Sequence, residues 1–424
     1  MTGGITLNVC LLNDSFPPLI DGVANTVINY AENLMAFGDK VTVAVPQYPD
    51  VTDNYDYEVL RYPSFNTTKL VGYRAGYPFI GSAVNAMKGF HPDIYHSHCP
   101  AASTFMSRTL RESVPAPVVF TYHTKFDIDI ARALKSHILQ DMTCNAMIKN
   151  IEACDDVWVV SNGAGKNLRS LGYHGDYRVM NNGVDFPRKS PDPDAVKELR
   201  EQYGLKDGIP VFLFVGRIMW YKGLRTVLDA LSALNEAGKD FRFMCVGSGQ
   251  DRDDVIRYAD KVRITDKCIF VDAIHDRERL RTYYGAADLF LFLSDFDTNG
   301  IVVREAAACG LGSMLLRGSA AAEGTENFRN AFLVDDNPAS AAAMLTRLCY
   351  EPQMMKTVGD RAMSELYFSW TDSVRIARDR YEQISDDYKS GKLKLKHQPG
   401  DSFFEFAADL NSVFERGKDL FSRN

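Results

Sequence analysis

Two cations follow an apolar run in the middle of the chain. The run Val211–Val215 predicts a buried strand that ends at Gly216, and Arg217 and Lys222 then flank a short turn before a helix-like pattern starts at Leu224. Open α/β sheets bind ligands at the carboxyl ends of their strands. A guanidinium and an ammonium there suit a diphosphate, because Arg offers a planar fork and Lys a mobile point charge. Two surface cations in a loop are the alternative.

Two acids follow another apolar run about eighty residues later. Leu289–Leu293 predicts a second buried strand, and Asp297 and Glu305 come after it, eight positions apart. We expect Asp297 in a loop and Glu305 two turns into an Ala-rich helix. The apolar neighbours of Glu305 favour a buried carboxylate with a partner over a solvated helical charge.

Together, Gly216-Arg217…Lys222-Gly223 and the Asp297-x7-Glu305 pair resemble, in order and spacing, the retaining glycosyltransferases of family 4. The resemblance covers most of the chain. It implies the GT-B fold, an α/β architecture of two Rossmann-like doubly wound domains that face each other across a cleft. It also implies a nucleotide-sugar donor. Where the family has a first Glu this chain has Asp297, which is one methylene shorter.

The resemblance implies a role for each catalytic candidate. Arg217 and Lys222 would neutralise the leaving diphosphate without an obligate metal or other cofactor. Asp297 would contact hydroxyls of the donor sugar. His123 would lie beside that sugar without acting as a classical general base, and His98 is the alternative in the same cleft.

The remaining candidates bind the donor. Glu305 would accept hydrogen bonds from both ribose hydroxyls, and Ile274 would contact the base through its main chain. A glycine at the head of a helix lets an anion approach the backbone N–H groups, so Gly22 is expected against the diphosphate. The other expected donor-binding positions are Gly216, Gly247, Asn299, Gly300 and Ile301.

Alternating strand and helix signals predict mainly parallel sheets flanked by helices. We expect an acceptor-side domain over residues 1–186 and a nucleotide-sugar-binding domain over residues 187–372. Residues 373–424 would form a helix that returns to the first domain, followed by a helical extension. The Pro- and charge-rich segment 186–208 is expected to be the linker.

Composition excludes several classes of protein. The chain has 424 residues, 46% of them hydrophobic, and a net charge of −7, which argues against a partner nucleic acid. No apolar run is long enough to span a bilayer and the start carries no secretory signal, so we expect a cytoplasmic protein. The eight cysteines are scattered, with no Cys-x-x-Cys, so we expect free thiols and no metal site.

The acceptor is predicted from the first loop. Its Pro-x-x-Asp-Gly-Val form, ending at Val23, resembles that of family 4 enzymes that glycosylate lipids, such as diacylglycerol glucosyltransferases. We therefore predict transfer of a hexose, with glucose the expected one, from a UDP-sugar to a lipid such as diacylglycerol. The enzyme is expected to bind peripherally at the cytoplasmic face of the membrane. The alternatives are a soluble sugar or polysaccharide intermediate as acceptor, a GT-B nucleotide-sugar epimerase, or a silent scaffold or binding protein.

Two further segments have an apolar stripe. Residues 126–140 predict an amphipathic helix, with a wall of the acceptor groove or a surface for anionic lipid as alternatives. A helix after Gly400, with Phe403, Leu410 and Phe414 on one face, is expected to pack onto the protein's own surface. A membrane or dimer contact is its alternative.

Overall fold

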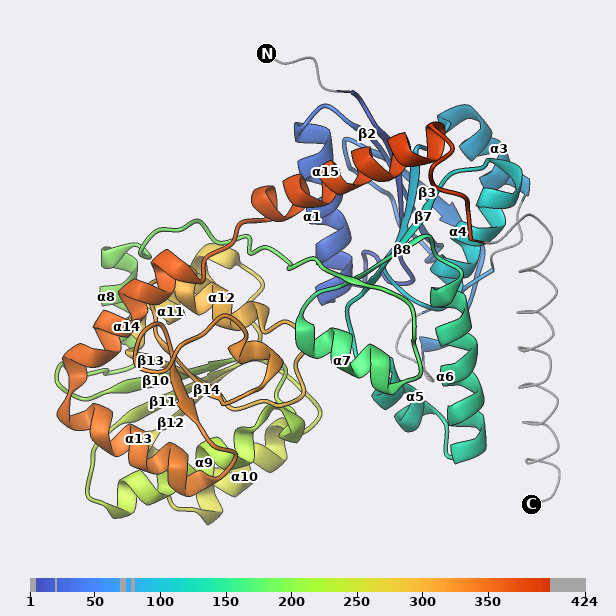
Figure 1. Cartoon of the computed structure of the whole chain (residues 1–424). Helices are drawn as coiled ribbons and strands as arrows, with labels where there is room; N and C mark the ends of the chain where they lie inside the picture. The colour runs from blue at the N-terminus through green and yellow to red at the C-terminus, as the bar shows by residue number, and fades with distance from the viewer. Residues whose placement is uncertain (1–4, 20, 69–73, 78–80, 397–424) are drawn as a thin grey trace. The chain divides into compact units, whose positions relative to one another are not determined.

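The chain divides into two compact units. The computed structural model describes residues 5–19, 21–68, 74–77 and 81–396 (Figure 1). The first unit runs to Asn182 and resumes at Trp370, and the second is the continuous stretch Gly183–Ser369. These divisions fall four and three residues before the expected ones at 186/187 and 372/373.

The first unit is built on a seven-stranded parallel sheet of order β3-β2-β1-β6-β7-β8-β9. A small antiparallel pair, β4 with β5, accompanies it. The strands are β1 (Asn8–Leu12), β2 (Lys40–Pro46), β3 (Glu58–Tyr62), β4 (Ser64–Phe65), β5 (Ala75–Gly76), β6 (Ile94–Ser97), β7 (Val118–Tyr122), β8 (Asp156–Val159) and β9 (Arg178–Val179).

Both faces of this sheet are buried, because successive side chains of a strand point to opposite faces. In β1, Val9 and Leu11 belong to one apolar cluster while Cys10 and Leu12 belong to another. The helices that supply the rest of these two layers are α1 (Gly22–Ala36), α3 (Gly81–Phe90), α4 (Ala102–Ser113), α5 (Phe126–Ala133), α6 (His137–Glu152), α7 (Asn162–Ser170) and α15 (Trp370–Lys389).

Helix α15 completes the first unit from the far end of the chain. It lies beside α1 (Figure 1), and its buried residues Trp370, Val374, Ala377 and Tyr381 recur every three to four positions, as one helical face requires. Arg378 of the same helix forms an ion pair of 2.7 Å with the buried Asp39. The segment after residue 369 therefore belongs to the first unit.

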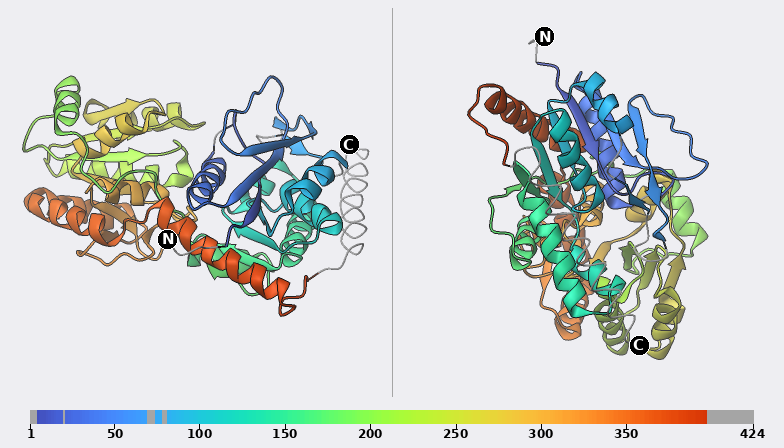
Figure 2. Two further views of the ribbon diagram at one scale, coloured as in Figure 1. Left: turned by 90° about the horizontal axis from the view of Figure 1, so that it is seen from above. Right: turned by 90° about the vertical axis from the view of Figure 1, so that its right-hand side faces the viewer.

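The second unit contains a six-stranded parallel sheet of order β12-β11-β10-β13-β14-β15, which lies between helices (Figure 2). Its strands are β10 (Val211–Val215), β11 (Arg242–Val246), β12 (Cys268–Val271), β13 (Leu289–Phe292), β14 (Ser313–Leu316) and β15 (Phe332–Val334). Its α-helices are α8 (Pro193–Gln202), α9 (Leu224–Glu236), α10 (Arg252–Lys261), α11 (Arg277–Ala286), α12 (Ile301–Ala308), α13 (Pro338–Tyr350) and α14 (Pro352–Glu365). Single turns of 3₁₀-helix are η1 (Trp220–Lys222), η2 (Thr265–Lys267) and η3 (Ala320–Ala322).

Some elements differ from the sequence-based expectations. Strands β3, β4, β5 and β15 were not predicted. The expected single helix over residues 126–140 is wrong, because the chain leaves the helix between α5 and α6, where Leu134 and Ser136 are extended. Glu305 lies one turn into α12, not two, since that helix begins at Ile301. The helix expected after Gly400 lies outside the described residues.

All eight cysteines are free thiols, as expected. Within the described residues, no group of three or more His, Cys, Asp or Glu side chains could hold a metal ion. No helix among them has the length and apolar character that crossing a membrane requires.

Candidate active site

The two loops that carry Arg217, Lys222 and Asp297 leave the second sheet at the point where its strand order reverses. β10 lies between β11 and β13, so the chain builds the sheet outward in one direction from β10 and in the other from β13. The loops after these two strands diverge from adjacent strand ends, and this is where doubly wound sheets bind ligands. One loop carries Arg217 and Lys222, and the other carries Asp297.

Lys222 and Asp297 join the two loops directly. The Lys222 Nζ lies 2.5 Å from the Asp297 Oδ2, and the two side chains are 12% and 21% exposed. Nζ also lies within 6.0 Å of three ring centroids, those of Tyr221, Phe292 and Phe296. The ammonium is therefore held by one carboxylate and the faces of three rings.

Arg217 is in a different situation. Its side chain is exposed, and no hydrogen bond or ion pair joins it to any other part of the chain that the structure describes. The two predicted cations thus differ, since one is held in place and the other is available to an incoming anion.

The backbone brings these two loops unusually close together. Gly223 has a left-handed φ of 78°, and a Cβ added to it would lie 1.8 Å from the carbonyl oxygen of Leu293, at the end of β13. Such a separation is far inside van der Waals contact. Only glycine fits this position, and its fit keeps Lys222 and Asp297 within reach of each other.

Glu305 is buried in α12, as predicted, and the structure shows its partners. Its Oε1 accepts from Nη2 of Arg277 at 2.6 Å, and its Oε2 accepts from the hydroxyl of Tyr284 at 2.9 Å. Burial, and next the charge of Glu305, raise the pKa of Tyr284 well above its usual value, so that this hydroxyl stays protonated and donates. Arg277 also pairs with Asp185 at 3.3 Å and lies 4.3 Å from the ring centroid of Phe186.

The sequence analysis predicted none of these partners of Glu305 and Arg277. Arg277 and Tyr284 lie on one face of α11, Phe186 begins the segment expected to be a linker, and Asp185 directly precedes it. The spacing of seven between Arg277 and Tyr284 fits one helical face and was the only signal available.

The other donor-binding candidates line the same end of the sheet. Gly216 and Gly247 end β10 and β11, and they pack so closely that a Cβ on Gly247 would lie 1.9 Å from the Gly216 carbonyl oxygen. Ile274 follows β12 and packs on the core. The α12 start holds the others: Gly300 is its N-cap residue, Ile301 begins the helix, and the buried side-chain amide of Asn299 has no hydrogen-bond partner among the described residues.

The first unit holds His123, at the carboxyl end of β7, in a buried histidine pair. His123 Nε2 lies 3.0 Å from Nδ1 of His98, which follows β6, and the two rings stack with centroids 5.2 Å apart. Burial lowers the pKa of His123 to about 3, so its ring is neutral at physiological pH. His96 is not part of this pair and instead hydrogen-bonds Thr121 and Tyr381.

Gly22 begins helix α1, as its sequence context predicted. Asp21 caps the helix by accepting from the backbone N–H groups of Val23 and Ala24 at 2.9 and 2.7 Å, while Gly22 is exposed with open space where a side chain would be. The first helical N–H groups therefore have one carboxylate partner from the chain itself.

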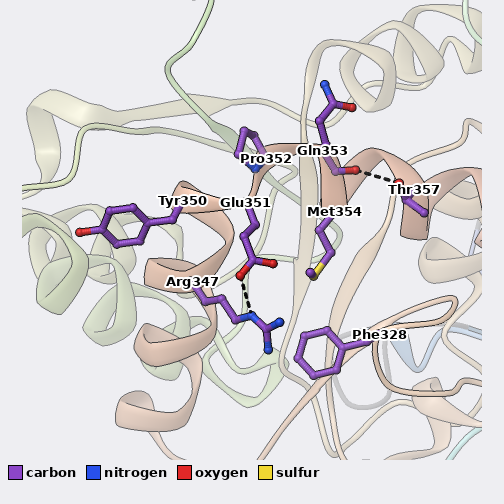
Figure 3. A pocket seen from close by; sticks show the side chains of 8 residues that line it. All are labelled: Phe328, Arg347, Tyr350, Glu351, Pro352, Gln353, Met354 and Thr357. Atoms are coloured by element: carbon purple, nitrogen blue, oxygen red, sulfur yellow. Dashed lines mark hydrogen bonds and ion pairs between the residues drawn. The ribbon is translucent and has the colours of Figure 1, made fainter.

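A hollow of about 630 Å³ lies elsewhere in the second unit, where α13 ends and α14 begins (Figure 3). Phe328, Tyr350 and Met354 form part of its lining, and Arg347 is paired with Glu351. None of the predicted site residues lines it.

Comparison with known proteins settles the family. A family model described as "Glycosyltransferase Family 4" matches residues 20–188, and one described as "Glycosyl transferases group 1" matches residues 195–364. The chain belongs to the family 4 glycosyltransferases. The two matches cover both units and include nearly all of the site residues described above.

The chain is similar in sequence to several glycosyltransferases. It is 24% identical to the alpha-monoglucosyldiacylglycerol synthase of Streptococcus pneumoniae over 308 residues, which are 72% of this chain and 70% of that protein. It is 28% identical to a GDP-mannose-dependent alpha-mannosyltransferase of Mycobacterium tuberculosis over 315 residues, 72% of this chain and 78% of that one.

Solved structures support the fold of the glycosyltransferase. Sucrose-phosphate synthase from Thermosynechococcus elongatus superposes with a TM-score of 0.71 at 21% identity, covering 89% of this chain and 99% of that one. Anabaena Alr3699/HepE, in complex with UDP and glucose, gives 0.69 at 16% identity with the same coverage. The predicted α/β architecture is confirmed, and the chain has the GT-B fold in two domains.

The close approach at Gly223 generates a first prediction. Gly223→Ala should destabilise the second unit by more than about 2 kcal/mol, because the methyl group clashes with Leu293 and the residue must also stay left-handed. Gly238→Ala is the matched control: its φ of 72° is similar but its surroundings are open, so about 1 kcal/mol is expected. Denaturant unfolding monitored by Trp220 fluorescence, in a background in which Trp158 and Trp370 are replaced by Phe, measures both, and equal losses would contradict the packing argument.

The buried histidine pair generates a second prediction. The pKa of His123 is about 3 when folded and about 6.5 when unfolded. Its contribution to stability is complete above pH 6.5 and is lost as the pH falls from there toward 3, by about 1.4 kcal/mol per pH unit.

The measurement is denaturant unfolding between pH 5 and pH 7.5 in a Trp220→Phe background, since Trp158 and Trp370 then report on the first unit alone. We expect stability to fall below pH 6.5, and His123→Gln to reduce the slope by about one proton. Parallel slopes in the two proteins would show that the His123 ring is not buried in its neutral form.

Proposed function

We propose that this glycosyltransferase moves glucose from UDP-glucose to a diacylglycerol-type lipid, with retention at the anomeric carbon. The observation that carries the proposal is the pairing of one fixed and one available cation, Lys222 and Arg217, at the strand reversal of the second unit. The departing group of a nucleotide sugar is a diphosphate, and cations placed where its charge develops stabilise the transition state.

Arg217 and Lys222 divide this task by their geometry. Arg217 is exposed and without a partner in the described chain, so it is suited to capture the diphosphate as it arrives. Lys222 is already held near its working position, so it needs little reorganisation when charge develops on the leaving oxygen. With two protein cations on the diphosphate, no metal ion is needed for this step.

Glu305 retains capacity for a donor. Each carboxylate oxygen has about two acceptor sites, and Arg277 and Tyr284 use one on each oxygen. One site per oxygen remains, which matches the two hydroxyl groups of a ribose. The contacts with Arg277 and with the buried Tyr284 keep the Glu305 carboxylate oriented for that purpose.

In the first unit, His123 would act on the sugar and Gly22 on the diphosphate. His123 is neutral, so its ring can hydrogen-bond a hydroxyl without adding charge beside an oxocarbenium-like centre. Gly22 opens the start of α1, whose N–H groups and positive dipole end favour an anion. The first unit would also supply the acceptor groove, because the proposed donor contacts lie mostly in the second.

The choice of glucose, UDP and a lipid rests on the similarity of this chain to two other proteins. The relative from Streptococcus pneumoniae is named for glucosylated diacylglycerol, and the Anabaena structure holds UDP and glucose. We place the reaction at the cytoplasmic face of the membrane, with the enzyme bound peripherally. GDP-mannose is the second candidate donor, because two relatives of 28% and 26% identity are named GDP-mannose-dependent alpha-mannosyltransferases.

The cations provide the direct test of catalysis. Replacing Arg217 or Lys222 by Ala should reduce turnover with the donor on the order of 100-fold or more, while circular dichroism stays unchanged. Lys206→Ala, an exposed cation remote in sequence from both loops, is the control and should retain full activity. Near-normal rates in both site variants would overturn the proposal.

A product screen tests the acceptor and donor. Radiolabelled UDP-glucose and GDP-mannose are each offered with diacylglycerol in anionic vesicles, with soluble sugars, and with no acceptor. We expect label in the lipid fraction from UDP-glucose. Label only in water-soluble glycosides would refute the lipid acceptor, and an epimerised sugar without acceptor would indicate an epimerase. Failure to bind either donor, measured by calorimetry, would indicate a scaffold.

A further inference from the structure

The contact between Lys222 and Asp297 changes the role expected for the acid. The family resemblance assigns the first acid of the pair to the hydroxyls of the donor sugar. In the structure the Asp297 carboxylate instead lies 2.5 Å from the Lys222 ammonium. We propose that Asp297 is a positioning residue that fixes Lys222 for the donor's diphosphate. This inference rests on the proposed function.

The length of the side chain supports this assignment. A Glu at position 297 would carry its carboxylate about 1.5 Å further along the side chain, which is one carbon–carbon bond. The shorter Asp places the carboxylate against Lys222 while its backbone stays in the loop after β13. The Asp side chain is therefore long enough to join the two loops through Lys222.

The surroundings hold this pair in place from both sides. Gly223 packs against the Leu293 carbonyl, which fixes the backbone next to Lys222 relative to the end of β13. Tyr221 and Phe296, the residues adjacent to the two charged ones, pack ring against ring with centroids 4.5 Å apart. Two independent contacts thus flank the ion pair, one through backbone and one through side chains.

Lys222 can serve Asp297 and a diphosphate together. An ammonium has three N–H donors, and Asp297 takes one of them. The other two remain for phosphate oxygens. A Lys side chain has a flexible four-carbon stem and loses conformational entropy when it is fixed. Because the ion pair already fixes Lys222, donor binding does not have to order this side chain.

The test compares a nucleotide with its sugar derivative. Calorimetry gives the Kd of UDP and of UDP-glucose for the wild type, Asp297→Asn, Lys222→Met and the double variant. If Asp297 acts through Lys222, Asp297→Asn weakens UDP and UDP-glucose by the same factor, about 10-fold. The double variant then binds no more weakly than Lys222→Met alone. Weakening of UDP-glucose with UDP unchanged would assign Asp297 to the sugar and overturn the proposal.

Asp295→Asn is the matched control, since it removes a carboxylate from the same loop at an exposed position two residues earlier. It should leave both dissociation constants unchanged. If the donor is GDP-mannose, the same comparison is made with GDP and GDP-mannose, so an error in the proposed donor is seen separately.

A second measurement needs no donor. The full chain is labelled with an amine-reactive reagent, and mass spectrometry of the peptide that contains Lys222 gives the labelling rate of this side chain. The rate reports how firmly the ammonium is held. We expect the rate to rise several-fold in Asp297→Asn and to stay at the wild-type level in Asp295→Asn. An unchanged labelling rate in Asp297→Asn would overturn the proposal, whether or not a nucleotide binds. Failure of the wild type to bind any nucleotide would instead refute the proposed function.

Discussion

The pairing of β10 with β13 is the constraint on which the candidate active site depends. Phe212 and Leu213 of β10 lie in register with Leu289 and Phe290 of β13, although 77 residues separate them in sequence. Because both strands run in the same direction, their carboxyl ends meet at one edge of the sheet. This register determines where the loop with Arg217 and Lys222 and the loop with Asp297 leave the sheet.

Electrostatics then divides the site into fixed and available groups. The carboxylate of Glu305 and the ammonium of Lys222 each have protein partners, so their positions are determined before a ligand arrives. Arg217 has no partner of this kind within the described residues. Under the proposed function this division suits catalysis, because preorganised charges act without reorganisation and an exposed, unpaired Arg217 can follow the ligand during entry and release.

Sequence predicted most of the architecture because strongly apolar runs such as Val211–Val215 and Leu289–Leu293 coincide with buried strands. It missed β3, where four of five residues are only half-buried or exposed and the apolar pattern is weak. It also joined α5 to α6, since a short extended break at Leu134 leaves the apolar spacing almost undisturbed. Periodicity reports burial, and it fails where an element is partly exposed or briefly interrupted.

The site was predicted only as far as local motifs reach. Cations and acids in short motifs were found, and the family is confirmed, whereas the individual roles of these residues stay predictions. Arg277 and Tyr284 were not found, because their importance comes from contacts with Glu305 across 28 and 21 residues. The partner of Lys222 was not found for the same reason: a separation of 75 residues leaves no trace in a local pattern.

The return of α15 to the first unit has a consequence for synthesis on the ribosome. The second unit is one continuous stretch and can fold as soon as residue 369 has emerged. The first unit must wait, because Val374, Ala377, Tyr381 and Ile384 complete the apolar cluster that covers α1 and one face of its sheet. The N-terminal half therefore finishes folding last, and a nascent chain stopped before Trp370 would present an uncovered apolar face to chaperones.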